Sequence, residues 1–296
     1  MSINIFYYEK CTFEYDYFRN IIFKDEKYDC KINWINYNDD NLNIFTEYTG
    51  KVNILITNPL ITKNYLIIIQ NILNPKIIFF LSDSMMKFKD YYNEFKCPYF
   101  HQHNLYDFYG DNLQIPLGYV SGYMDKKIDI DLDTIIDNKI YDFSFVGEIK
   151  RDRELMINTF KEHFFKKYIS IGKTDWSNIE NNKIKPCDIY KIYQKSFFIP
   201  IGRGNYSYDC FRFYEAIMSN SIPVLVGDID KINRAYDFDG IKPIYIVSNT
   251  WESVCELCKK MMNDGEMIKT ILNYNNIWWE KINNRIIDRI NKLILI

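Results

Sequence analysis

Residues 195–228 read KSFFIPIGRGNYSYDCFRFYEAIMSNSIPVLVGD, and they decide the fold class of the chain. Two unbroken apolar runs, 196–201 and 222–226, enclose a glycine-bearing loop and a helical pattern that begins near Asp209. A crossover of this length joins parallel strands, and unbroken apolar runs are typical of strands that are buried on both faces. The stretch therefore predicts a strand, loop, helix and strand within a parallel sheet.

The loop at 202–205 has the chemistry of an anion site. Its glycines let the backbone approach a ligand, and the unpaired amides and dipole of the following helix favour negative charge. Arg203 in the loop and Arg212 in the first helical turn add two guanidinium groups, which match phosphate oxygens. Glu215 follows Arg212 by three residues on the same helix face, where a ribose diol would fall. The alternative is a simple pair of Arg212 with Glu215 on a solvated helix face.

The same stretch and a second one upstream share a pattern with a known family. The matching residues are Pro200, Arg203, Gly204, 211–213 (FRF), Glu215, Ala216 and 222–224 (IPV), and upstream 143–148 (FSFVGE) with Arg151 and Arg153. In these residues the chain resembles exostosin-like glycosyltransferases, near a xylosyltransferase branch. The resemblance covers about residues 140–250. It implies the GT-B fold, in which two Rossmann-like, doubly wound α/β domains face a central cleft.

The resemblance also implies a reaction. A sugar is transferred from a nucleoside diphosphate donor, expected to be UDP-linked with UDP-xylose as a candidate, to a hydroxyl of a glycan or glycoprotein acceptor. The implied reaction is inverting and requires no metal or other cofactor, because arginines can stabilise the leaving diphosphate. The residues expected to bind the donor are Gly147, Arg151, Arg203, Gly204, Asn205, Ser207, Arg212 and Glu215.

A group that takes the proton of the acceptor hydroxyl is expected at a strand end of the N-terminal half. Asp83 ends the run KIIFFLSD and is the first candidate, although it also suits the N-cap of a following helix. His101 is the second candidate, with His103 next to it in YFHQHN. An H-x-H spacing on a strand places both rings on one face, which a metal site can use.

Two alternatives from other classes of protein stay open. Asp228 and Asp230 form a D-x-D pattern, with which a metal-dependent GT-A transferase holds a divalent cation against a diphosphate. The other alternative is a catalytically silent protein that binds glycans or protein partners. Nucleotide binding that survives EDTA favours the GT-B enzyme, binding lost in EDTA favours the GT-A enzyme, and no binding favours the silent protein.

Strand-like and helix-like patterns alternate along the whole chain, and two such series predict two parallel sheets. The expected strands are 2–8, 31–37, 52–58, 76–82, 99–104, 112–119, 141–147, 166–172, 195–201, 221–227 and 243–248. The expected helices are 12–24, 60–73, 84–95, 152–164, 186–194, 209–219, 250–263 and 266–292.

The polar stretch 125–140 is the expected linker between the two domains. Residues 1–124 then form an N-terminal, acceptor-side Rossmann-like domain, and residues 141–265 form a C-terminal domain that binds the nucleotide sugar. The final segment, 266–296, is expected to be a helix that packs back on the N-terminal domain.

The composition narrows the class of protein. A chain of 296 residues with net charge −2 and a pI near 6.0 lacks the basic excess of a dedicated nucleic-acid binder. Neither a secretory signal nor an apolar run long enough for a membrane span is visible. Seven cysteines without a repeating frame indicate reduced thiols. We therefore expect a cytoplasmic protein, and the richness in Asn, Ile, Lys and Tyr suits an AT-rich bacterial or viral genome.

Overall fold

The computed structural model describes most of the chain. The described residues are 2–11, 13–48, 51–82, 87, 94–103, 113–125, 127, 131, 134–173, 184–204, 207–238 and 240–295. The chain divides into two compact units, the first made of residues 1–117 with 283–296 and the second of residues 118–282. Each unit is an α/β layer structure around one parallel sheet, so the prediction of two Rossmann-like sheets is confirmed.

The first unit contains a six-stranded sheet in which every pairing is parallel. Its strands are β1 (Ser2–Tyr8), β2 (Lys31–Tyr37), β3 (Val52–Thr57), β4 (Ile77–Phe80), β5 (Tyr99–His101) and β6 (Leu113–Gln114). The strand order is β2-β1-β3-β4-β5-β6, so the winding direction reverses between β1 and β3. Ligands of such sheets bind at this switch point, beyond the carboxyl ends of the strands. We call that end of a sheet its carboxyl edge.

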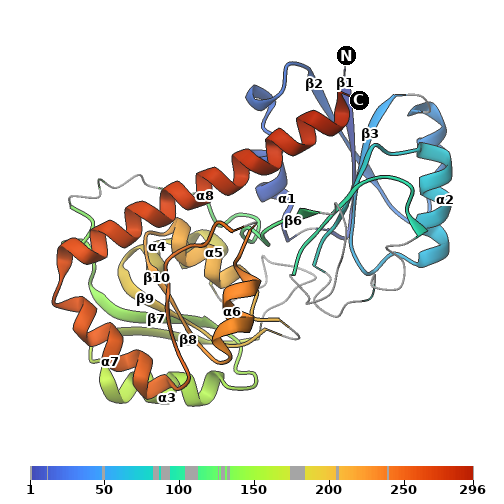
Figure 1. The fold of residues 1–296 in the computed structure, drawn as a ribbon. Coiled ribbons are helices and arrows are strands. Elements are labelled where there is room, and N and C mark those ends of the chain that lie inside the picture. Colours follow the sequence, from blue (N-terminus) through green and yellow to red (C-terminus); the bar gives the residue numbers. More distant parts are fainter. Residues whose placement is uncertain are drawn as a thin grey trace. The chain divides into compact units, whose positions relative to one another are not determined.

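The strands of this sheet are apolar because helices cover both faces. Figure 1 shows α1 (Tyr15–Tyr17) and α2 (Lys63–Leu73) on opposite sides of it. The predicted helix 12–24 is shorter than expected, since α1 passes into a π-helical turn, η1 (Phe18–Ile22). Two 3-10 helices complete the unit, η2 (Asp25–Lys27) and η3 (Leu42–Tyr48). Most of the predicted helix 84–95 lies outside the described residues.

A row of amides, buried at Asn4 and Asn53 and half-buried at Asn33, crosses three strands of the first sheet. Asn33 Nδ2 donates to Asn4 Oδ1 at 3.0 Å, and Asn4 Nδ2 donates to Asn53 Oδ1 at 3.0 Å. Asn53 Nδ2 in turn donates to the carbonyls of Tyr48 and Leu73 at 2.9 and 3.2 Å. A slip of one residue would leave these buried groups unpaired, so the row fixes the register of β2, β1 and β3.

The second unit contains a five-stranded parallel sheet in the order β11-β10-β9-β7-β8. Its strands are β7 (Tyr141–Gly147), β8 (Lys167–Ile171), β9 (Ser196–Ile201), β10 (Ile222–Val226) and β11 (Ile246–Ser248). Counted from the first strand of each unit, both sheets begin with the same order. The switch point of the second sheet lies between β7 and β9.

Helices cover both faces of the second sheet, with α3 and α7 on one face and α4 and α5 on the other (Figure 1). The helices are α3 (Arg153–His163), α4 (Pro186–Gln194), α5 (Phe211–Met218), α6 (Ile229–Ala235), α7 (Trp251–Met262) and α8 (Gly265–Ile294). The short helix α6 was not among the predicted helices. Cys255 and Cys258 of α7 are buried in the core, where they act as small apolar side chains.

Residues 125–140, which the sequence marks as a linker, belong to the second unit. Ile135 is buried in its core, and buried Lys139 donates to the carbonyl of Gln194 at 2.9 Å and to that of Asn220. Burial lowers the pKa of the Lys139 ammonium to about 7. Although this stretch is polar in composition, Ile135 and Lys139 therefore attach it to the second unit.

The long helix α8 contributes to both units. Ile268, Ile271 and Leu272 near its start join the core of the second unit. Residues 283–296 group with the first unit, where Asn283 Oδ1 accepts a hydrogen bond from Tyr17 Oη at 2.9 Å.

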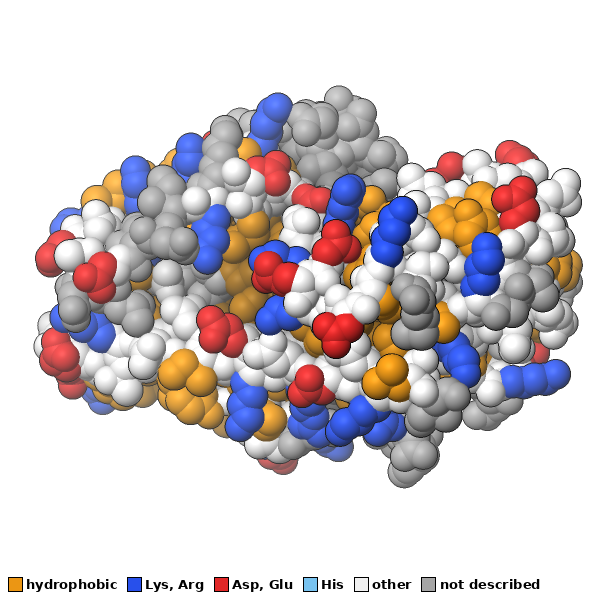
Figure 2. Space-filling model, turned by 90° about the horizontal axis from the view of Figure 1, so that it is seen from above, with side chains coloured by type: hydrophobic (Ala, Val, Ile, Leu, Met, Phe, Trp, Pro, Cys, Tyr) orange, Lys and Arg blue, Asp and Glu red, His pale blue; other side chains and the backbone are white. Residues whose placement is uncertain are grey.

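Charged side chains of both signs are interspersed on the face seen in Figure 2. Among the described residues, no helix combines the length and the apolar character that a bilayer crossing requires.

Candidate functional site

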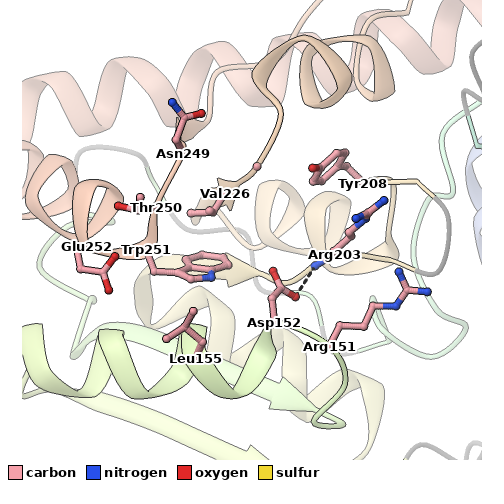
Figure 3. A pocket seen from close by; sticks show the side chains of 11 residues that line it. Arg151, Asp152, Leu155, Arg203, Tyr208, Val226, Asn249, Thr250, Trp251 and Glu252 are labelled. Atoms are coloured by element: carbon pink, nitrogen blue, oxygen red, sulfur yellow. Dashed lines mark hydrogen bonds between the residues drawn. The ribbon is translucent and has the colours of Figure 1, made fainter.

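The carboxyl edge of the second sheet carries a pocket of about 650 Å³. Loops that follow four strands line it, with Arg151 and Asp152 after β7, Arg203 and Tyr208 after β9, Gly227 after β10, and residues 249–252 after β11. Figure 3 shows Trp251 and Leu155 together on one side, and Arg151, Arg203 and Tyr208 on the other. The pocket thus joins an apolar wall to a cationic one.

Hydrogen bonds connect the loops around this pocket. The backbone N–H of Arg203 donates to Asp152 Oδ1 at 3.2 Å, which ties the loop after β9 to the loop after β7 (Figure 3). The Asp228 N–H donates to Tyr208 Oη at 3.1 Å, and the Arg203 guanidinium lies 5.6 Å from the centre of the Tyr208 ring. Gly227 has φ 145° and leaves room for that ring, since an added Cβ would collide with Tyr208 Oη.

Arg151 has a strained backbone with φ 55°. Of the other non-glycine residues described with positive φ, Asn74 and Asn220 follow helix ends, where asparagine commonly takes this conformation. Arg151 has no such explanation. Strain of this kind costs about 1–3 kcal/mol and is concentrated at ligand sites.

Arg212 sits at the switch point and is half-buried. Its Nη2 donates to the carbonyl of Val146 at 2.9 Å, its Nε donates to Tyr193 Oη at 3.2 Å, and its guanidinium lies 4.8 Å from the Phe145 ring centre. Gly147, with φ 147°, allows this approach, because an added Cβ would lie 2.5 Å from Arg212 Nη2. The structure therefore brings together two residues, Gly147 and Arg212, that were each expected to bind the donor.

Arg153 opens α3 beside Arg212. Its Nη1 donates to the carbonyl of Glu148 at 2.9 Å, whereas its buried Nε has no partner among the described residues. Burial lowers the pKa of Arg153, and the charge of Arg212 lowers it further. Two guanidinium groups are thus held close together, an arrangement that an anion would stabilise.

Glu215 is not on a solvated helix face, since its side chain is 8% exposed. Its Oε1 accepts from the N–H of Val120 at 3.4 Å, and the described residues show no ion pair between Glu215 and Arg212. Burial raises the pKa of Glu215 to about 7, although the charge of Arg212 opposes the shift. The simple surface ion pair considered for these two residues is therefore wrong.

The other predicted donor residues lie in the loop after β9. Gly204 packs tightly, because an added Cβ would be 2.7 Å from the Ser207 carbonyl oxygen. Ser207 is buried, and its Oγ accepts from the Asp209 N–H at 3.2 Å. Asn205 lies outside the described residues.

The D-x-D pattern has a local structural role. Asp228 is the N-cap of α6, where its Oδ1 accepts from the Lys231 N–H at 3.2 Å, and its other oxygen lies 3.5 Å from Lys231 Nζ. The described residues contain no cluster of three or more side chains suited to a metal. Asp228 therefore has capping and ion-pair partners that explain its position without a cation.

At the carboxyl edge of the first sheet, Asp83 lies outside the described residues, whereas His101 and His103 are both buried. His101 ends β5, and His103 follows in a bend with φ 63°, so the two do not share one strand face as predicted. Burial lowers the pKa of each imidazole to about 4, which keeps both neutral near pH 7.

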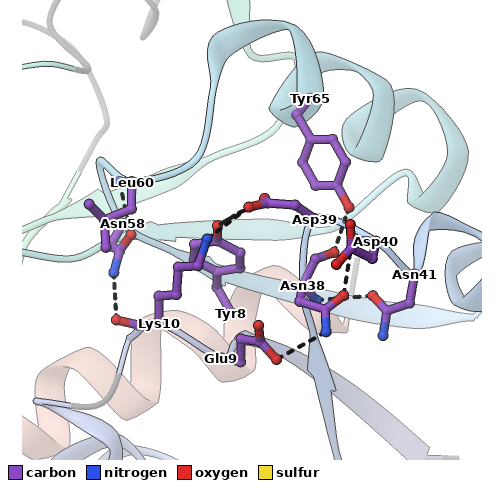
Figure 4. A network of polar contacts seen from close by, with 10 residues as sticks. All are labelled: Tyr8, Glu9, Lys10, Asn38, Asp39, Asp40, Asn41, Asn58, Leu60 and Tyr65. Atoms are coloured by element: carbon purple, nitrogen blue, oxygen red, sulfur yellow. Dashed lines mark hydrogen bonds and ion pairs between the residues drawn. The ribbon is translucent and has the colours of Figure 1, made fainter. Parts of the chain in front are cut away.

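A polar network surrounds the switch point of the first sheet (Figure 4). Lys10 Nζ and Tyr8 Oη both bond to Asp39, at 2.9 Å, and Asn58 Nδ2 donates to the Lys10 carbonyl at 3.0 Å. Burial and Asp39 raise the pKa of Tyr8 to about 12. These residues connect the loops that follow β1, β2 and β3.

Several residues at the carboxyl edges of the two sheets were not predicted from the sequence. In the second unit they are Asp152, Tyr208 and residues 249–252, and in the first unit Glu14, which is fully buried after β1. The signal was present, because each follows an apolar run. Extending the strand-end rule to β1 and β11 would have found Glu14 and residues 249–252, whereas Asp152 and Tyr208 follow β7 and β9, next to residues that were predicted.

Comparison with known proteins gives no match, either to a protein-family model or to a curated protein.

Proposed function

We propose that the protein is a glycosyltransferase that binds a nucleoside diphosphate sugar at the carboxyl edge of the second sheet and transfers the sugar to a hydroxyl. One observation carries the proposal. Four arginines gather at this edge, and none makes an ion pair with a carboxylate of the described residues: Arg151, Arg153, Arg203 and Arg212. Unneutralised guanidinium groups at a switch point favour a phosphate-bearing ligand.

The free donors of these arginines suit a diphosphate. Arg212 bonds through Nε and Nη2, which leaves Nη1 without a partner in the described part of the chain, and Arg153 likewise retains Nε. Negative charge grows on the diphosphate as the bond to the sugar breaks. Guanidinium groups fixed by Val146 and Glu148 carbonyls need little reorganisation, so they stabilise the transition state more than the ground state.

The pocket beyond the arginines suits the nucleoside. Trp251 and Leu155 offer an apolar wall to a base, and the polar side chains of Asn249 and Thr250 lie on the same rim. UDP is the nucleotide that the exostosin resemblance suggests, and UDP-xylose is one donor to try.

A thermal-shift screen with UDP, UDP-xylose, UDP-glucose and UDP-galactose, each with and without EDTA, tests the proposal. Ligand at about 100 times its dissociation constant stabilises a protein by roughly 2.7 kcal/mol, which gives a visible shift of the melting temperature. We expect a shift that EDTA leaves unchanged. The absence of any shift would contradict the proposal and favour a silent binding protein, whereas a shift abolished by EDTA would favour the metal-dependent alternative.

A further inference from the structure

A carboxylate stands among the arginines of the pocket in the second unit without a complete structural role. Asp152 lines this pocket and is half-buried. It is the N-cap residue of α3, where an aspartate usually accepts a hydrogen bond from the helix backbone, yet its side chain caps nothing. Its Oδ1 accepts from the Arg203 N–H at 3.2 Å, and its Oδ2 has no hydrogen-bond partner among the described residues. One oxygen is thus held in place, and the other is left for a ligand.

Trp251 lines the same pocket and leaves a hydrogen-bond donor unused. It is 3% exposed, and the N–H of a buried indole usually finds an acceptor. The equally buried Trp278 donates its Nε1 to the Ile241 carbonyl at 3.2 Å. Nε1 of Trp251 has no such partner in the described part of the chain, and it is not one of the fully buried unpartnered atoms found there. The small exposed part of Trp251 therefore includes Nε1, and it faces the pocket.

The groups that line the pocket follow an order. Leu155 lies three residues after Asp152, on the same face of α3, and is 60% exposed. Figure 3 shows Asp152 between Trp251 on one side and Arg203 on the other. The pocket thus passes from an apolar wall, through a carboxylate, to guanidinium groups. A nucleotide has the matching order of base, ribose and diphosphate.

The chemistry at Asp152 selects a hydroxyl. A carboxylate repels a phosphate, so the part of the ligand that meets Oδ2 must donate a hydrogen bond. A hydroxyl both donates and accepts, so ribose hydroxyls can supply the bond that Asp152 Oδ2 lacks and the one that Trp251 Nε1 lacks. Glu215, which the sequence suggested for the ribose, is 8% exposed and does not line this pocket.

We propose that Asp152 and Trp251 bind the ribose hydroxyls of the donor nucleotide, and that the site therefore selects ribonucleotides against their deoxy forms. The assignment rests on the proposed glycosyltransferase function. Both residues belong to the second unit, as do all the residues that line the pocket. They set the specificity of binding and take no part in breaking the bond to the sugar.

The first measurement uses the wild-type protein alone. Calorimetry gives its affinity for ADP, CDP, GDP and UDP, and the nucleotide that binds most tightly is then compared with its 2′,3′-dideoxy form. A hydrogen bond to a charged acceptor is lost with the hydroxyls, so we expect the dideoxy form to bind about 10- to 100-fold more weakly. The ratio of the two affinities is the quantity to follow in variants, because a change in the charge of the pocket affects both ligands alike.

The variants assign this ratio to residues. Asp152→Ala removes the acceptor, and we expect the ratio to fall at least about fivefold. Trp251→Phe removes the donor and keeps an aromatic ring in the core, and we expect a fall of about two- to tenfold. Glu154→Gln is the matched control and should keep the wild-type ratio, since Glu154 is an exposed carboxylate of the same helix that does not line the pocket. If Asp152→Ala does not fold, Asp152→Asn takes its place with the same expected direction.

The outcomes separate this assignment from the proposed function. A wild type that binds a nucleotide and its dideoxy form within twofold overturns the ribose assignment and leaves the proposed function standing. An unchanged ratio in the Asp152 variant overturns the role of Asp152. If that variant instead weakens UDP-glucose relative to UDP and keeps the ratio, the carboxylate meets the transferred sugar, and the ribose assignment is wrong. Failure of the wild type to bind any of the four nucleotides overturns both proposals.

Discussion

The two sheets share a strand order but differ in the side chains at their carboxyl edges. Arg153 and Arg212 lie at the switch point of the second sheet, with their guanidinium groups fixed by backbone carbonyls. Among the described residues, the corresponding edge of the first sheet has two neutral histidines and the buried carboxylate of Glu14. One topology therefore presents two chemically different carboxyl edges, because loops after the strands, and not the strands, carry the polar groups.

Glu14 and Glu215 are buried glutamates at the carboxyl edges of the two sheets, and their surroundings differ. Burial raises the pKa of each to about 7, but only Glu215 has an arginine near it. Arg212 opposes the shift of Glu215, whereas the hydroxyl of Ser82 opposes that of Glu14. The following predictions test this difference between a carboxylate beside a cationic site and a carboxylate without one.

The largest expected effect is on the pH dependence of stability. A carboxyl with a raised folded pKa contributes stability below its unfolded pKa, near 4.5, and loses it as pH rises through about 7. Each glutamate accounts for about 3 kcal/mol over this window. Glu14→Gln and Glu215→Gln should each remove one such contribution, measured by urea unfolding at pH 5 and pH 8.

The buried histidines act in the opposite sense over part of the same range. Their lowered pKa values destabilise the fold as pH falls from about 6.5 to about 4. The informative quantity is therefore the difference between each variant and the wild type at the two pH values. An equal difference at pH 5 and pH 8 for Glu14→Gln would contradict the shift assigned to Glu14.

The next largest expected effect is a loss of nucleotide affinity when Arg212 is removed. Arg212→Ala removes a charged donor that the Val146 carbonyl of β7 holds in place, so we expect UDP affinity to fall about 10- to 100-fold, or 1.5–3 kcal/mol. Arg234→Ala, on exposed α6 of the same unit, is the control and should bind UDP normally. Calorimetry measures both. Equal affinities for the two variants would exclude Arg212 from the site.

Glycine substitutions test the close approach at the same edge. Gly147→Ala places a methyl group 2.5 Å from Arg212 Nη2 at φ 147°, and we expect a loss of about 1–3 kcal/mol in stability and weaker UDP binding. Gly172→Ala is the matched control, because no atom of the described residues lies within 4 Å of its added Cβ. Melting temperatures and UDP affinities of the two variants test the contact between Gly147 and Arg212. Similar losses of stability and of affinity in both variants would contradict a specific contact at Gly147.

The smallest expected effect is that of chelation. Asp228 caps α6 and pairs with Lys231, so EDTA should leave the UDP affinity of the wild type unchanged. Asp228→Asn should likewise bind UDP within about twofold of the wild type, since asparagine is as good an N-cap. A loss of affinity in EDTA that Mn²⁺ restores would revive the metal-dependent alternative.

Much of the secondary structure could be predicted from the sequence. A strand lies within each of the eleven predicted ranges, although only 113–114 of the range 112–119 and 246–248 of the range 243–248 are strand. Unbroken apolar runs such as 77–80 are typical of parallel strands covered on both faces. The short helix α6 was missed since seven residues give too little periodicity, and its cap, Asp228, was considered as a metal ligand. Glycine at 147 and arginine at 212 were both predicted for one site, and the structure brings them together.

The sequence by itself determined two series of parallel strands and the cationic character of the second, since apolar periodicity and residue type are local properties. Only the tertiary structure decided which polar groups are buried and what they meet. Glu14 and Ser82 are 68 residues apart, and Lys139 bonds to carbonyls at 194 and 220. Desolvation and long-range hydrogen bonds depend on the packing of distant segments, so a local sequence pattern does not predict them.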